Sequence, residues 1–318
     1  MPNKLVIISR RIFKKIRKKG SKKSLTPYPF AEYTHQIASD LIKAKLESDS
    51  PCMIARFGSV ELNIIHEYCI SKLGYKKYLK YILGDINSYK INDSSYIAAY
   101  NNAGIFPSNN SILSRFSETM LQDMLEVDIL GSWLSQENYF KEELSKTVKV
   151  RLPDLEPYYH NNPWSSCLEN KNILVIHPFV ETIKEQYKKR VALFKDTSVL
   201  PEFNLRTIKS IQSIAGNNTG FEDWFEALNY MKNLIDREKF DIAIIGCGAY
   251  GFPLAAHVKR IGKKSIHLGG ATQILFGIKG NRWVNHKFTS NLFNKNWVFP
   301  NNDETPNGFK NIEDGCYW

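Results

Sequence analysis

The stretch KFDIAIIGCGAYGFPLAA (residues 239–256) joins an apolar run to a Gly-x-Gly-x-x-Gly turn at Gly246, Gly248 and Gly251. In such a turn the first glycine permits a sharp bend, the second lets a phosphate approach the backbone, and the third lets helix and strand pack closely. The following helix adds backbone N–H donors at its N-terminus. The order of strand, turn and helix predicts a site for a phosphorylated or nucleotide-linked small molecule, with a purely structural turn as the alternative.

The residues downstream of this turn disfavour a nicotinamide dehydrogenase. Such an enzyme places Asp or Glu about 20 residues further on to bind a ribose. Here residues 263–270 read KKSIHLGG and contain no acid. A nucleotide that acts as a leaving group stays open.

Apolar runs alternate with helical patterns along most of the chain. The predicted strands are residues 52–57, 96–100, 127–130, 173–177, 203–208, 241–246 and 265–268. The clearest helix covers residues 221–237, with Thr219 and Glu222 at the spacing of a capping box. This alternation predicts an α/β fold with a mostly parallel, Rossmann-like sheet and helices on both faces. Ligands of such sheets bind at the carboxyl ends of the strands.

Bulk properties limit the class of protein. The 318 residues are 43% hydrophobic, but no apolar run reaches the roughly 18 residues of a membrane-spanning helix. The start resembles no secretory signal, and five scattered cysteines suggest neither a disulfide framework nor a metal site. We expect a cytoplasmic protein with a tail (residues 1–24) and one α/β domain (25–318), which could divide into halves at 25–160 and 161–318.

The positive charge is concentrated at the N-terminus. Residues 1–23 hold ten Lys and Arg residues and no acid, which leaves +1 of the net charge of +11 for the rest of the chain. Apolar residues recur among them near helical spacing, from Leu5 to Ile16. A basic amphipathic segment binds anionic membrane surfaces, and a solvated tail is the alternative. We expect no nucleic-acid partner, because the body lacks a basic excess and a reader motif.

A first group of polar residues follows the predicted strand at 52–57. Arg56, Gly58, Ser59 and Glu61 stand where this strand passes into a helix. Arginine is suited to bind phosphate. A carboxylate in the first helical turn either binds a divalent cation or interacts favourably with the helix dipole.

Two further groups follow later strands. His177 and Glu181 come after residues 173–177, and either is a candidate general base for an acceptor hydroxyl. The last strand is followed by paired glycines and by polar and basic residues suited to a sugar, a base edge or phosphate. The predicted binding residues there are Gly269, Gly270, Gln273, Lys279 and Arg282.

The segment Ile54-Ala-Arg56-Phe-Gly58-Ser59-Val-Glu61-Leu62 resembles the first motif of GT-D type glycosyltransferases, which is Arg, an aromatic residue, then Gly-Asp-Gly-Glu. The resemblance spans most of residues 50–283 in the order of elements. It implies that Arg56 and Glu61 act on the diphosphate of a nucleotide sugar, with Mn²⁺ or Mg²⁺ bound at Glu61. Ser59 replaces the aspartate of the family, and serine is a poor metal ligand.

The resemblance implies a nucleotide-sugar-dependent glycosyltransferase of polysaccharide biosynthesis. Its acceptor would be a surface polysaccharide or a lipid-linked glycan, and the basic tail would hold it at the inner face of the membrane. Two alternatives remain open. One is a Rossmann-like methyltransferase that uses S-adenosylmethionine, and the other is a non-catalytic scaffold at the membrane.

Overall fold

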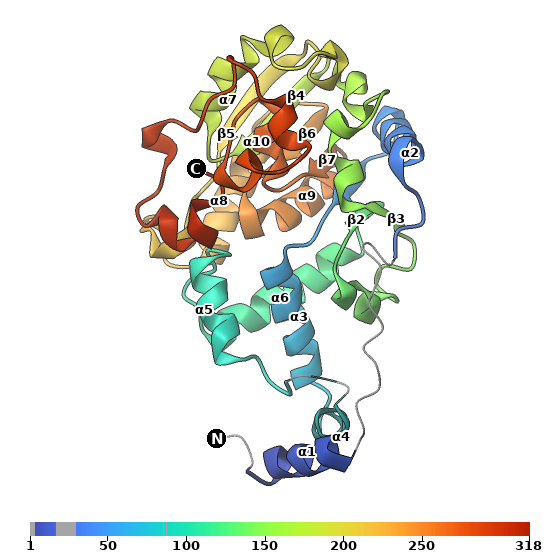
Figure 1. The fold of residues 1–318 in the computed structure, drawn as a ribbon, viewed down its shortest axis with the longest axis vertical. Coiled ribbons are helices and arrows are strands. Elements are labelled where there is room, and N and C mark those ends of the chain that lie inside the picture. Colours follow the sequence, from blue (N-terminus) through green and yellow to red (C-terminus); the bar gives the residue numbers. More distant parts are fainter. Residues whose placement is uncertain (1–3, 17–29, 85, 87) are drawn as a thin grey trace.

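The structure, a computed structural model, describes residues 4–16, 30–84, 86 and 88–318. Its centre is one sheet of seven strands, all parallel, in the order β3-β2-β1-β7-β6-β4-β5. The strands are β1 (Cys52–Ala55), β2 (Ile129–Ser132), β3 (Val148–Arg151), β4 (Asn172–His177), β5 (Asn204–Lys209), β6 (Ile242–Ile245) and β7 (Lys264–His267). The predicted Rossmann-like α/β fold is confirmed (Figure 1).

Helices connect the strands and cover both faces of the sheet (Figure 1). Those before β4 are α1 (Lys4–Ile16), α2 (His35–Glu47), α3 (Ser59–Ser71), α4 (Lys76–Leu83), α5 (Asp93–Asn101) and α6 (Asn110–Met124). Those after β4 are α7 (Val180–Tyr187), α8 (Trp224–Asp236), α9 (Gly251–Arg260), α10 (Ala271–Leu275) and α11 (Asn281–Val284). The chain after α11 consists of short 3-10 turns and irregular segments.

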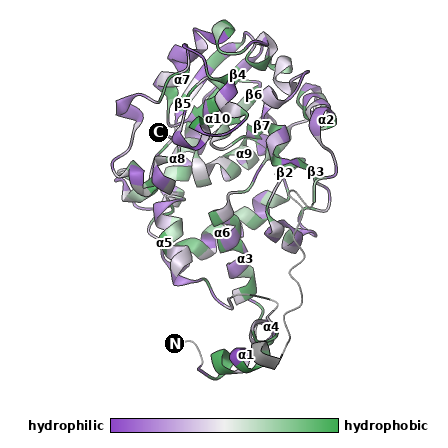
Figure 2. Ribbon diagram, in the orientation of Figure 1, coloured by the Kyte–Doolittle hydropathy of each residue, from purple (hydrophilic) through white to green (hydrophobic). Residues whose placement is uncertain are grey.

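Successive residues of a strand enter two separate cores. In β1, Met53 and Ala55 pack with α3, α6, α8 and α9, whereas Cys52 and Ile54 pack with α2 on the other face. All four are fully buried. A strand covered on both faces needs no polar side, which explains the uninterrupted apolar run of β6. Figure 2 shows hydrophobic residues along the central strands.

The last strand of the sequence lies at the centre of the sheet. β7 pairs with β1 on one side and with β6 on the other. It thereby joins the three strands from residues 25–160 to the strands from residues 161–318. Because parallel strands end at one edge, the turns after β1, β7, β6 and β4 become neighbours.

The strand prediction from the sequence contains one false strand and omits one real strand. Residues 96–100 belong to α5, not to a strand. Asn92 precedes this helix in an extended conformation, and its backbone N–H donates to Glu67 at 3.0 Å. β3 is absent from the sequence-based prediction because it is a short edge strand in which only Val150 is buried.

The helix predicted at residues 221–237 exists, but it begins differently. α8 starts at Trp224, and the N-cap is Asp223, whose carboxylate accepts two backbone N–H bonds of the first turn at 2.8 Å. The predicted capping box at Thr219 and Glu222 is therefore wrong. The buried stripe of this helix faces the core as expected.

The N-terminal helix is described as far as Ile16. α1 packs against α4 at the end of the molecule remote from β4 and β5 (Figure 1). The Arg10 guanidinium lies 4.0 Å from the ring centroid of Tyr81 and donates to the Ile86 carbonyl at 2.8 Å. No helix in the described part of the chain is long and apolar enough to cross a membrane. Residues 17–29, which include the basic residues 17–23 of the predicted tail, lie outside the described residues.

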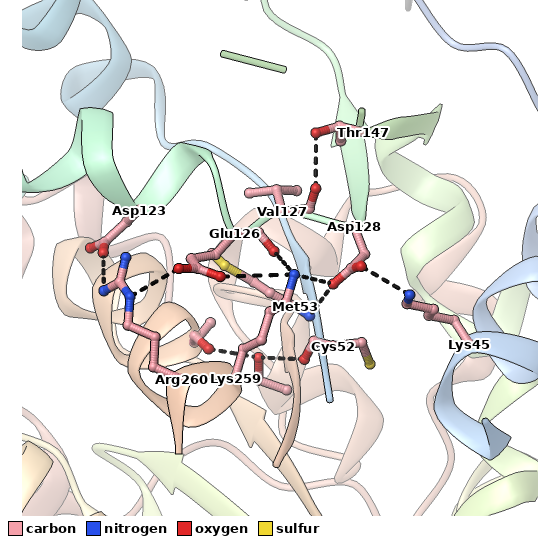
Figure 3. Close-up of polar contacts among 12 residues, drawn as sticks. Lys45, Cys52, Met53, Asp123, Glu126, Val127, Asp128, Thr147, Lys259 and Arg260 are labelled. Atoms are coloured by element: carbon pink, nitrogen blue, oxygen red, sulfur yellow. Dashed lines mark hydrogen bonds and ion pairs between the residues drawn. The ribbon is translucent and has the colours of Figure 1, made fainter. Parts of the chain in front are cut away.

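Paired charges hold the amino-terminal edge of the sheet (Figure 3). Asp128, just before β2, accepts the backbone N–H of Met53 at 2.8 Å. It also forms ion pairs with Lys45 of α2 and Lys259 of α9, both at 2.9 Å. One carboxylate thus ties two helices to two strands.

Arg260 extends this network toward α6. Its guanidinium pairs with Asp123 at 2.6 Å and with Glu126 at 3.1 Å (Figure 3). Asp123 is almost fully buried, and one of its two oxygens has no partner among the described residues.

Candidate functional site

A cavity of about 180 Å³ lies at the carboxyl edge of the sheet. Its walls come from the turns after β1, β4, β5, β6 and β7 and from the C-terminal segment. The predicted site residues that line it are Arg56, Gly58, Ser59, Glu61, His177, Gly246, Gly248, Gly269, Gly270, Gln273 and Arg282. Three predicted site residues, Glu181, Gly251 and Lys279, do not line it.

Arg56 lies directly after β1, in the wall of the cavity. Its guanidinium carbon lies 5.1 Å from the ring centroid of Trp133, whose indole N–H donates to the Phe57 carbonyl at 3.0 Å. Burial lowers the pKa of Arg56, and the positive charge of Arg282 lowers it further. The neighbouring Glu61 and Tyr317 act in the opposite direction and raise it. No carboxylate of the described residues lies within ion-pair distance of Arg56.

Arg282, at the start of α11, brings a second positive charge to the cavity. Its guanidinium lies 5.0 Å from the ring centroid of Tyr317 and donates to the Tyr317 hydroxyl at 3.4 Å. The two arginines lie close enough for one charge to lower the pKa of the other. A bound anion would relieve this repulsion.

Two glycines in the cavity wall need their backbone conformation. Gly248 and Gly269 have φ values of +56° and +60°, which side chains rarely adopt. No atom lies within 4 Å of the place where a Cβ of Gly248 would stand. Gly269 faces Arg56, whose Cδ would lie 3.5 Å from such a Cβ. The backbone of both turns is therefore accessible from the cavity.

The third glycine of the motif, Gly251, has the packing role expected of it and does not line the cavity. A Cβ on Gly251 would lie 2.1 Å from the ring of His267, so this glycine makes room for the histidine against α9. Gly246 likewise makes room for Thr272, whose hydroxyl oxygen would lie 2.5 Å from its Cβ. Gly251 therefore acts in packing, as the third glycine of such turns does, and not as a binding residue.

The predicted metal ligand does not fit a metal site. A Cβ on Gly58 would lie 1.9 Å from a carboxylate oxygen of Glu61, so the carboxylate folds over the start of α3. This is the favourable place for an acid in the first helical turn. Ser59 adds only a hydroxyl, and the described residues contain no cluster of three His, Cys, Asp or Glu side chains that could hold a metal ion. Ser59 and Glu61 therefore do not form a site that fits a divalent metal ion.

Two neutral histidines face the cavity with opposite tautomers. His177 Nδ1 accepts the backbone N–H of Phe179 at 3.0 Å, which leaves the proton on Nε2. His267 Nδ1 lies 3.2 Å from the Ile245 carbonyl and must donate to it, which leaves a lone pair on Nε2. Burial lowers the pKa of each to about 3, with Arg56 contributing at His267. This geometry favours a hydrogen-bond donor role for His177 over the predicted general base.

Glu181 lies away from the cavity, on the exposed side of α7, where it pairs with Lys184 at 2.8 Å. The start of α7 is already bound by the buried carboxylate of Glu304, which accepts the backbone N–H groups of Glu181 at 2.8 Å and Thr182 at 3.2 Å. A residue from the C-terminal segment thus occupies this helix N-terminus. The catalytic role of Glu181 has no support in this geometry.

Gln273 and Lys279 are also engaged differently from the prediction. The Gln273 side-chain amide donates to the carbonyls of Lys279 at 2.9 Å and Tyr317 at 3.1 Å, so it fastens the C-terminal segment. The Lys279 ammonium lies 5.7 Å and 5.9 Å from the ring centroids of Phe293 and Phe299. Gln273 therefore stabilises the C-terminal segment that covers the cavity, whereas Lys279 contacts two rings outside the cavity wall.

Several lining residues were not predicted from the sequence. Ile312, Tyr317 and Trp318 cover the cavity from the C-terminal segment. Ser210 follows β5, and its buried hydroxyl has no partner among the described residues. A buried polar atom without a partner at a cavity is typical of a group that binds a ligand or water. The position of Ser210 after a strand was the available signal.

Comparisons of the chain with known protein families, curated proteins and solved structures found no match.

Proposed function

We propose that the chain is a glycosyltransferase that binds a nucleotide sugar in this cavity. The main support is the convergence of Arg56 with the turns at Gly58, Gly248 and Gly269, which come from three different strands. A diphosphate needs cations and accessible backbone N–H groups, and this edge of the sheet offers both. The acceptor would be a surface polysaccharide or a lipid-linked glycan.

The charges of the cavity suit the leaving group of glycosyl transfer. When the bond between the sugar carbon and the diphosphate oxygen breaks, negative charge grows on the phosphate. Arg56 and Arg282 lie at the cavity and bring two positive charges to it. Fixed positive groups in a site shielded from water stabilise such charge strongly. The arginines would take the role for which other transferases use a metal ion.

The histidines suit the acceptor side. In this proposal the Nε2–H group of His177 donates a hydrogen bond to a sugar or phosphate oxygen, and Nε2 of His267 accepts a hydrogen bond from the attacking hydroxyl and orients it. The acceptor oxygen bonds to the sugar carbon as the bond from that carbon to the diphosphate breaks. The hydroxyl proton passes to the departing diphosphate, which is more basic than an imidazole with a pKa of about 3. The cavity is smaller than the 300–1,000 Å³ or so of typical ligand pockets. A nucleotide sugar would therefore occupy it with the diphosphate and place its remaining parts at the opening.

A methyltransferase and a non-catalytic scaffold would each need different features in this cavity. S-adenosylmethionine carries a positive sulfonium, which two neighbouring arginines disfavour. A scaffold without activity would have no need for the accessible backbone at Gly248 or for the buried hydroxyl of Ser210, which has no partner among the described residues. We therefore place the transferase first.

The proposed location is the cytoplasmic face of the membrane. None of the five cysteines forms a disulfide, which is consistent with a reducing compartment. Membrane attachment would place the cavity near a lipid-linked acceptor.

Calorimetry with UDP, GDP and their sugar conjugates tests the binding site. We expect binding by the wild type and a loss of about 30-fold for Arg56→Met, because a charge-assisted contact with phosphate disappears. The matched control is Arg206→Met, an exposed arginine of β5 that pairs with Glu238 outside the cavity. Binding that is absent, or equally strong in both variants, would refute the site.

A second measurement separates the enzyme from the scaffold. Release of nucleoside diphosphate is followed with each nucleotide sugar that binds, with water or added glycolipid as acceptor. Turnover that falls with His267→Gln supports the transferase. Tight binding without release under any of these conditions favours the scaffold, and a thermal shift with S-adenosylmethionine instead of nucleotides favours the methyltransferase.

A further inference from the structure

The helices α1 and α4 are two basic segments that lie far apart in the sequence. Residues 1–23 hold ten Lys and Arg residues and no acid. Residues 68–84 hold Lys72, Lys76, Lys77 and Lys80 and no acid. In the structure α1 packs on α4 (Figure 1). The helices α1 and α4 contain no acid, and together they lie at one end of the described part of the molecule.

α1 turns an apolar row outward. Leu5, Ile8 and Ile12 follow one another at helical spacings of three and four, and they are 71%, 50% and 54% exposed. Exposed Lys4 and Arg11 flank this row on the same side of the helix. The opposite side carries Arg10, which is buried against α4. The outward side of α1 is therefore apolar at its centre and basic at its margin.

α4 has the same organisation. Tyr75, Leu79 and Leu83 recur at intervals of four and are 72%, 54% and 43% exposed. Lys76 and Lys80 lie next to this row and are exposed as well. None of the side chains of α4 is buried. Figure 2 shows hydrophobic and hydrophilic residues side by side along this helix pair.

We propose that α1 and α4 together form a docking surface for an anionic lipid bilayer. Apolar residues at the centre enter the boundary between headgroups and acyl chains, while the flanking cations attract anionic headgroups. Both parts of this chemistry occur on both helices. Nucleic acid would use the cations but gain little from exposed leucine and isoleucine, so a bilayer is the better match.

This inference goes beyond the sequence-based expectation, which placed membrane binding in residues 1–23 alone. α4 lies in the body of the chain and adds its own row. Because none of the residues of α1 and α4 lines the cavity, docking and ligand binding are separable. The surface does not depend on the reaction that the cavity supports.

Vesicle co-sedimentation tests the proposal with the full chain. The probes are vesicles of phosphatidylcholine alone and of phosphatidylcholine with about one third phosphatidylglycerol. We expect binding to the anionic vesicles that weakens with salt and little binding to the neutral ones. The decisive variant is Leu79→Ser/Leu83→Ser, which we expect to lose at least about tenfold in affinity, as should Ile8→Ser/Ile12→Ser.

A charge variant and a control complete the experiment. Lys76→Glu/Lys80→Glu leaves the apolar rows intact and should weaken binding by about fivefold or more for each lysine. Val191→Ser changes a residue that is 64% exposed on another part of the surface, and it should bind like the wild type. Circular dichroism establishes that each variant is folded.

Three results would overturn the proposal. One is unchanged vesicle binding by both α4 variants, which would restrict docking to the N-terminal segment. Another is equal binding to neutral and anionic vesicles. The third is a dimer in solution that the Leu79→Ser/Leu83→Ser variant dissociates, because the apolar rows would then cover each other between two copies of this chain.

Discussion

The amino-terminal edge of the sheet contains ion pairs, whereas the carboxyl edge brings positive charges together. At the amino-terminal edge, Asp128 pairs with Lys45 and Lys259 and accepts a backbone N–H (Figure 3). At the carboxyl edge, Arg56 has no carboxylate of the described residues within ion-pair distance and a second arginine nearby. The same sheet therefore carries a neutralised cluster at one edge and an excess of positive charge at the other.

This difference separates stability from function. Taking a charge out of water costs free energy, and a well-placed partner offsets much of the cost. The amino edge follows this rule, so its charges contribute to the fold. At the carboxyl edge, Glu61 and Glu156 act on Arg56 only from beyond ion-pair distance. The cost is therefore only partly offset, which is typical of sites where a ligand supplies a closer partner. Substitutions at the two edges should therefore affect different properties.

The largest expected effect is at Asp128. Burial alone would raise the pKa of Asp128, but hydrogen bonds from Lys259, Met53 and Lys45 lower it. Asp128→Asn keeps an acceptor for the backbone and removes the charge. We expect the free energy of unfolding to fall by about 3 kcal/mol in urea titrations, because two lysines lose their partner.

A surface pair provides the control for this measurement. Asp93, which is 93% exposed, lies 3.6 Å from Lys90, so Asp93→Asn should change stability by less than about 0.5 kcal/mol. Nucleotide binding should stay as in the wild type for both variants. Equal stability of the Asp128 and Asp93 variants would contradict the assignment of the amino edge to stability.

Asp123 lies at the amino edge, and one of its carboxylate oxygens has no partner among the described residues. Burial raises its pKa from 3.8 to about 6, Arg260 and Lys232 lower it, and Glu126 raises it. Between these two pH values the native carboxyl holds a proton that the unfolded chain has lost, so its contribution to stability falls as the pH rises.

The variant Asp123→Asn removes this titration. The stability of the wild type minus that of the variant should decline by up to about 3 kcal/mol between pH 4 and pH 6.5, at constant ionic strength. Using the difference between the two proteins cancels the titration of other groups. A difference that stays constant over this range would show that folding leaves the pKa of Asp123 unchanged.

Much of the carboxyl edge could be predicted from the sequence because its signals are local. The apolar runs before Arg56, His177 and Gly246 marked strand ends, and parallel strands bring their ends together without further information. The glycine turn at Gly248 was recognisable for the same reason. Eleven of the predicted residues line the cavity, although their individual roles were not determined by this reasoning.

Three of the failures involve contacts between distant parts of the chain. Glu304 binds the start of α7, and no local pattern near Glu181 indicates this. Gln273 fastens Tyr317, a partner 44 positions away in the sequence. Residues 96–100 form a helix whose start is fixed by Glu67 rather than by their own apolar character. Tertiary partners of this kind override local propensity.

Substitution of Arg56 tests the difference between the two edges, because it should weaken nucleotide binding and raise the free energy of unfolding. Arg56→Met removes a cation without an ion pair but retains a long apolar side chain for packing. Beside the loss of nucleotide affinity, we expect the free energy of unfolding to rise by about 1 kcal/mol. Thermal or urea unfolding without ligand measures this. A marked loss of stability would mean that Arg56 is a structural residue, and the contrast between the edges would then not hold.

The smallest expected effect is at Ser210. Its hydroxyl is buried at the cavity without a partner among the described residues, so the apo protein gains nothing from it. Ser210→Ala should leave the free energy of unfolding unchanged or slightly higher and weaken nucleotide binding by about fivefold, the value of one hydrogen bond.

Ser213→Ala is the matched control, since that hydroxyl already donates to the Gly104 carbonyl at 2.6 Å. There we expect lower stability, because the substitution leaves a buried carbonyl without its donor. If both serines lowered stability alike and neither changed affinity, the polar groups of the carboxyl edge would serve the fold, as those of the amino edge do.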